Sequence, residues 1–153
     1  MATTTASFSL SSSDILSNAI SLSSTSTLYN HNTTATGLTQ VKSGRVDVYV
    51  TGSSFDLIPA LASEEASAAN SYVYIANKNT DVANYVNISI YSEVIGRLYA
   101  GDWMFIPWEQ NDPDSDNSSK NDIEIEALVG GPQSVEWIMF TESTATILDA
   151  SGD

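Results

Sequence analysis

The chain has 153 residues, with five Lys or Arg against 19 Asp or Glu, giving a formal net charge of −14. This length suits one domain whose core is large enough to fold without disulfides or a structural metal. The absence of Cys excludes a disulfide framework, a thiolate zinc site and a cysteine nucleophile. The acidity argues against nucleic-acid binding, and no apolar run reaches the roughly 18 residues of a membrane-spanning helix. We therefore expect neither a nucleic-acid nor a membrane partner.

Residues 1–40 form a segment rich in Ser and Thr that carries a single charged residue, Asp14. A disordered tether is one interpretation of such a composition. Apolar residues at alternate positions favour strands instead, so we predict an extended arm with one or two strands. Because the arm has almost no charge, it is suited to contacts between subunits. Its candidate contact residues are Phe8, Leu10, Leu16, Ile20 and Leu22.

Residues 41–153 show repeated strand patterns separated by turn signals. Apolar residues alternate with polar ones at 46–50 and 86–90, and the 123–127 segment has one apolar and one acidic face. The segment 72–76 is apolar on both faces, which is typical of a central strand, and 135–141 is another two-sided strand. Only 60–70 has a helical composition. We therefore predict an all-β domain at 41–153, an antiparallel β-sandwich or jelly-roll-like barrel.

An acidic stretch at residues 111–122 is the sharpest local feature. Asp112, Asp114 and Asp116 stand at alternate positions, as oxygen ligands do at the start of a calcium loop. However, Asn117 occupies the position of the required Gly, and Ile123 that of the bidentate Glu. A plain connection between strands is the favoured interpretation, with calcium binding as the alternative. We therefore expect no firm metal site and no cofactor.

Paired carboxylates raise the question of glycoside hydrolysis, which uses two acids that flank a sugar bond. Glu124 and Glu126 share one strand face, and Asp102 and Glu109 bracket the strand that contains two tryptophans. The simpler interpretation is that Glu124 and Glu126 form the solvated face of a half-buried strand. The tryptophans then fill a core or an interface. We expect no enzymatic activity.

Five strand motifs follow one another from residue 72 to residue 140. They are YVYIAN at 72–77, VNISI at 86–90, IGRLYAGDWMFIPW at 95–108, DIEIEA at 122–127 and VEWIMF at 135–140. In this order they resemble small all-β virion proteins of tailed phages, particularly those of marine and cyanobacterial hosts. Each motif alone is ordinary strand-and-turn chemistry, so the order carries the resemblance. The acidic stretch at 111–122 is longer than the family pattern.

The resemblance implies a non-enzymatic structural protein that decorates or cements the outer capsid. Its partners would be the major capsid protein or other virion proteins. It implies a homo-oligomer, with a trimer as the working expectation, assembled in the host cytoplasm and located on the outer surface of the virion. Further candidates for subunit contacts, if exposed, are the aromatic residues Tyr72, Tyr74, Trp103 and Trp108. The alternative function is a tail or fibre component that binds a host surface glycan.

Overall fold

A computed structural model describes residues 4–13, 19–29, 37–38, 40–50, 52–60, 70–109, 121–129 and 131–141. Within these ranges all regular structure is β-strand, and no helix is long and apolar enough to cross a membrane. Most of the segment with a helical composition, 61–69, lies outside the described residues. The strands are β1 (Thr4–Ser12), β2 (Ile20–Leu28), β3 (Gln40–Val48), β4 (Phe55–Ile58), β5 (Asn70–Asn77), β6 (Tyr85–Ile90), β7 (Glu93–Tyr99), β8 (Trp103–Glu109), β9 (Ile123–Ala127) and β10 (Gln133–Thr141).

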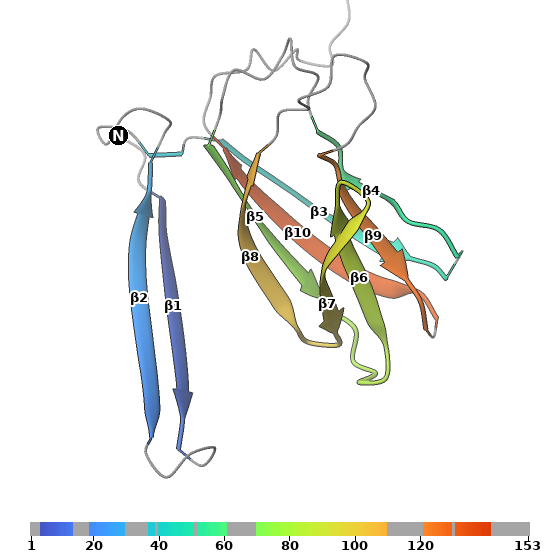
Figure 1. Ribbon diagram of the computed structural model, residues 1–153, viewed down its shortest axis with the longest axis horizontal. Coiled ribbons are helices and arrows are strands. Elements are labelled where there is room, and N and C mark those ends of the chain that lie inside the picture. Colours follow the sequence, from blue (N-terminus) through green and yellow to red (C-terminus); the bar gives the residue numbers. More distant parts are fainter. Residues whose placement is uncertain are drawn as a thin grey trace, which may run out of the picture.

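Eight of these strands build two four-stranded antiparallel sheets, β3-β10-β5-β8 and β4-β9-β6-β7 (Figure 1). The pairing is nested: β3 pairs with β10, β4 with β9, β5 with β8, and β6 with β7. The chain from β3 to β10 is thus one long hairpin of four strand pairs, rolled into two facing sheets. This is the topology of a jelly roll. The prediction of an antiparallel, jelly-roll-like sandwich is confirmed.

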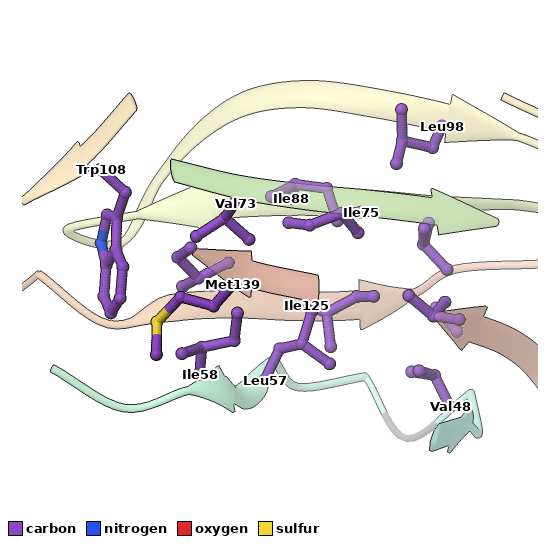
Figure 2. Close-up of a cluster of buried hydrophobic side chains, with 14 residues drawn as sticks. Val48, Leu57, Ile58, Val73, Ile75, Ile88, Leu98, Trp108, Ile125 and Met139 are labelled. Atoms are coloured by element: carbon purple, nitrogen blue, oxygen red, sulfur yellow. The ribbon is translucent and has the colours of Figure 1, made fainter. Parts of the chain in front are cut away.

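The core lies between the two sheets, where inward-facing side chains from both interdigitate (Figure 2). Val73 and Ile75 of β5 meet Ile88 of β6 and Ile125 of β9, and all four are 0% exposed. Each buried aliphatic side chain of this size contributes about 1.5–3 kcal/mol. In the sheets β5 lies between β10 and β8, and β10 between β3 and β5. The segment 72–76, predicted as a central strand, is therefore central, and so is the two-sided segment 135–141.

The predicted faces of β9 are also as expected. Ile123, Ile125 and Ala127 are buried, whereas Glu124 and Glu126 alternate with them and are partly exposed. Since a strand turns successive side chains to opposite sides, this alternation fixes which face of the sheet looks outward.

Polar side chains fix one end of the sandwich. The Asn77 Nδ2 donates to the Leu98 carbonyl at 3.1 Å, and the Asn79 backbone N–H donates to the Asn77 Oδ1 at 3.0 Å. The Asn79 Nδ2 donates to the Gln133 Oε1 at 2.9 Å, and the Gln133 Nε2 donates to the Val129 carbonyl at 3.0 Å. Asn77 and Gln133 are 0% exposed. Because buried amides are costly when unpaired, this network ties the start of β10 to the end of β5.

The N-terminal arm forms a two-stranded sheet of its own, β1-β2, beside the sandwich (Figure 1). The end of the hairpin opposite its connecting turn, here called its base, is held by buried side chains and a hydrogen bond. Leu28 and Leu38 are 4% and 3% exposed, and the Thr4 Oγ1 donates to the Leu38 carbonyl at 3.2 Å. A bridge between Tyr29 and Gly37 closes the same region. The predicted arm is thus a hairpin with an anchored base.

Candidate protein interaction surface

The two faces of the β1–β2 hairpin differ sharply in chemistry. One face consists only of hydroxyl residues, and the Ser7 and Thr25 hydroxyl oxygens lie 3.2 Å apart across the strands. The other face, called here the hairpin's apolar face, carries all the large apolar side chains of the two strands. Its members are Ala6, Phe8, Leu10, Ile20, Leu22 and Leu28. Strict alternation over nine-residue strands produces this separation.

Most of the hairpin's apolar face is uncovered. Leu28 at the base is buried, but toward the connecting turn Leu10 is 51% exposed and Leu22, its cross-strand partner, is 53% exposed. Phe8 and Ile20 are 42% and 36% exposed. Single exposed apolar residues are ordinary, whereas a contiguous group marks an interaction surface.

A second apolar surface lies on the outer side of the β3-β10-β5-β8 sheet. Tyr74 stands opposite Ile138 of β10 and opposite Phe105 of β8. The Tyr72 and Phe105 rings stack with centroids 5.6 Å apart, and the Tyr74 and Trp103 rings are 6.1 Å apart. Rings at these distances attract each other, and this attraction adds to the stabilisation that comes from burying their surface. The set called here the aromatic face comprises Tyr72, Tyr74, Trp103, Phe105, Ile138 and Phe140.

These two surfaces line a common hollow of about 690 Å³. Five members of the aromatic face form one side, all except Tyr72. The other side is residues 4–8 of β1 with Ser24, Ser26 and Leu28 of β2, and these three β2 residues point to the same side of the hairpin as its apolar face. Well-packed protein interiors hold few voids larger than a water molecule. The hairpin therefore stands off from the sheet instead of packing on it.

The outer side of the other sheet mixes polar and charged side chains with apolar ones. The Arg97 guanidinium lies 4.2 Å from the centroid of the Tyr85 ring, and its Nε donates to the Asn87 Oδ1 at 3.1 Å. The Ser54 hydroxyl donates to the Glu124 Oε2 at 3.1 Å. These polar side chains bond to one another, and exposed apolar residues of β7 such as Val94 and Tyr99 stand among them. The hairpin lies beside the aromatic face and not beside this sheet.

The sequence-predicted contact residues fall into four groups, and the fourth is the buried Trp108. Phe8, Leu10, Ile20 and Leu22 lie on the hairpin's apolar face, and Trp103 lies on the aromatic face with 52% exposure. Leu16 lies outside the described residues.

Trp108 requires a correction. It is 5% exposed, belongs to the core, and its Nε1 donates to the Asn121 carbonyl at 2.9 Å. Trp103 and Trp108 are an odd number of positions apart on one strand, so they point to opposite sides of the sheet. Only the first can contact another subunit.

The carboxylates named as candidates for chemistry lie in different parts of the chain, and some of them lie outside the described residues. Asp112, Asp114 and Asp116 lie outside the described residues, so calcium binding there stays a prediction. Among the residues that the structure describes, no group of three or more His, Cys, Asp or Glu is placed to hold a metal ion. Asp102 and Glu109 flank opposite ends of β8, roughly 20 Å apart, whereas glycosidase carboxylates lie within about 10 Å. The Asp102 Oδ2 accepts the Tyr99 N–H at 3.0 Å and so supports the β7–β8 turn.

Three members of the aromatic face were not identified from the sequence: Phe105, Ile138 and Phe140. The signal that points to them is the pair of strands that are apolar on both sides. A two-layer sandwich covers only one side of each sheet, so the second apolar side of β5 and β10 must lie on the surface.

No protein-family model matches the chain, and no curated protein matches its sequence.

Proposed function

We propose that this chain is a non-enzymatic structural subunit of a tailed-phage virion. It decorates or cements the outer capsid through protein–protein contacts, with the major capsid protein or another virion protein as partner. The carrying observation is the uncovered apolar face of the hairpin beside an aromatic sheet surface. The order of strand motifs at 72–140 and the jelly-roll topology, which recurs in viral capsid proteins, support the same function.

Charge supports a position on the outside of the capsid. A net charge of −14 keeps free subunits apart in solution and makes contact with packaged nucleic acid unfavourable. The described residues of the hairpin carry no charged side chain, so they can approach another protein without this repulsion.

The test is co-sedimentation of the full chain with emptied heads of cyanobacterial tailed phages, followed by immunogold labelling of intact virions. We expect saturable binding and label on the head. The variant L10S/L22S, which removes two exposed leucines of the hairpin, should bind more weakly. The matched control V94S/I95S removes two exposed apolar residues of β7, which are 60% and 46% exposed, and should bind like the unmodified chain. No binding, or equal binding by both variants, contradicts the proposal.

A tail or fibre protein that binds a host glycan is the second candidate. The observation in its favour is the half-exposed Trp103 ring beside Tyr74, since aromatic rings on a sheet face stack against sugars. Jelly rolls also occur in lectins. A glycan array decides: saturable binding that W103A abolishes, with label on the tail, supports this function over the first.

A further inference from the structure

We infer that the aromatic face is the docking site for the hairpin of a second copy of this chain, so that neighbouring copies are joined by exchanged hairpins. The inference rests on the proposed structural function and names the partner of the hairpin. Its test uses the purified chain alone, so it can fail or succeed independently of capsid binding.

The first argument is that the sandwich needs a third layer. In a two-layer sandwich each sheet buries one face and exposes the other. The inner side of β5 and β10 is filled by core residues such as Val73 and Val135, both 0% exposed. Their outer side presents Tyr74 and Ile138 next to the rings of β8, whereas the outer side of the other sheet mixes carboxylates and amides with its apolar side chains. An apolar outer side of this kind is stabilised when another apolar layer covers it.

The second argument is that the chain's own hairpin does not supply this layer. The hollow of about 690 Å³ separates the two surfaces within one chain. The end of the hairpin nearest its connecting turn lies beyond the ends of β5 and β8 (Figure 1). Leu10, Ile20 and Leu22 are therefore absent from the lining of the hollow and stay exposed.

The anchored base of the hairpin limits how it can move. Leu28 and Leu38 are buried there, and the Thr4 hydroxyl bonds to the Leu38 carbonyl. Figure 1 shows the turn end of the hairpin lying past the ends of β5 and β8. A rotation about the base does not shorten the hairpin, so its turn end would still lie past the edge of the sheet. The apolar end is covered only when it reaches a surface on another molecule.

The third argument identifies that molecule as a second copy. Copies carrying a charge of −14 repel each other over most of their surface. The members of the aromatic face and of the hairpin's apolar face are uncharged, although Glu136 borders the aromatic face on β10. These members are where two copies can meet with the least electrostatic repulsion. Each copy carries both halves of the contact, as exchange around a closed symmetry requires.

The area is sufficient for a stable contact. A hairpin of nine-residue strands is about 30 Å long and 10 Å wide, a footprint of roughly 300 Å² on each partner. Two exchanged hairpins, counted on both partners, cover roughly 1,200 Å², which is the lower end of specific protein interfaces. The contact area of a single hairpin would be well below that lower limit.

The experiment is the mass of the full chain in solution by light scattering across a dilution series. We expect a closed oligomer, and a dissociation constant that L10S/L22S raises about 100-fold or more, since each substitution acts in both exchanged contacts. W103S should act in the same direction from the other side of the contact, without altering the hairpin. V94S/I95S is the matched control and should leave the constant unchanged. A chain that is monomeric at every concentration overturns the inference, as does an oligomer that neither W103S nor L10S/L22S weakens.

Cross-linking then identifies which copy supplies the hairpin. The chain has no Cys, so S24C on the hairpin and I138C on the aromatic face give single reactive sites. A tagged S24C chain mixed with an untagged I138C chain should form a mixed product with a short bis-maleimide. If the double variant S24C/I138C instead joins only within one chain, the hairpin closes on its own sheet and the inference is wrong. A chain that oligomerises and cross-links as expected but ignores phage heads would leave the inference standing and remove the proposed function.

Discussion

Gly44 shows how a single residue makes room for a large ring. It stands directly opposite Trp137 in the β3–β10 pair, and a Cβ at this position would lie 2.7–2.9 Å from three atoms of the indole. Replacing a strand Gly by Ala normally stabilises a protein slightly. Here we expect G44A to lower the free energy of unfolding by about 1–3 kcal/mol, because the ring must leave its position. Urea denaturation measures the change.

The control for that substitution is G131A, where an added Cβ meets no atom within 4 Å. We expect the urea midpoint of G131A to equal or slightly exceed that of the unmodified chain. Equal midpoints for the two variants would show that Trp137 moves aside without cost.

The turn between β6 and β7 is strained at two residues. Tyr91 and Ser92 have φ of 58° and 59°, in the left-handed region that favours Asn and Gly. Changing the pair to Asn-Gly keeps the two-residue connection and removes the steric cost. We expect the free energy of unfolding to rise by about 1 kcal/mol and the Tm by roughly 2–4 °C. Thermal unfolding by circular dichroism measures this, S92G alone should give part of the gain, and a fall in Tm would mean that the Tyr91 side chain contributes to stability.

At the scale of elements, the sequence predicts strands well because a strand has a short, local signature. Alternation at 123–127 is enough to identify β9 and both its faces, and the two-sided pattern at 72–76 is enough to place β5 in the middle of a sheet. Pairing is a different matter, since β3 and β10 lie at opposite ends of the sandwich sequence and nothing local records their contact. The error at Trp108 came from grouping it with Trp103 by composition, when their spacing already separates them.

Of the two surfaces, the sequence predicts the hairpin's apolar face but not the full extent of the aromatic face. The apolar alternation in the arm identifies Phe8, Leu10, Ile20 and Leu22 from sequence alone. The aromatic face that lies across the hollow depends on the neighbouring positions of β10, β5 and β8, which only the folded topology provides.

The hairpin and the central strands should differ in how fast their backbone amides exchange with solvent. A two-stranded sheet is marginal alone, whereas β5 and β10 are paired on both sides above a buried core. We expect β1 and β2 to exchange fastest in dilute protein, and their protection to increase with protein concentration while that of β5 and β10 stays constant. Hydrogen–deuterium exchange at two concentrations measures this. Protection of the hairpin that does not depend on concentration would argue against exchange between copies.

For the whole molecule, charge opposes the association that the apolar surfaces favour. Added salt shortens the distance over which the −14 charges repel, with a Debye length of about 10 Å at 0.1 M. We expect the dissociation constant of the oligomer to fall several-fold between low and high NaCl, as sedimentation equilibrium can measure. Association that weakens with salt would instead indicate ion pairs across the contact.

The three tryptophans give the chain a built-in optical reporter of its own assembly. Trp108 is buried and Trp137 is partly buried against the core, whereas Trp103 is half exposed on the aromatic face. In dilute protein, a neutral quencher such as acrylamide should therefore quench mainly the fluorescence of Trp103. When a neighbouring hairpin covers that ring, the quenchable share of the emission should fall and its maximum should shift to the blue. Assembly can thus be followed by intrinsic fluorescence in an unlabelled protein, whether the neighbour is a free copy or one already seated on a capsid.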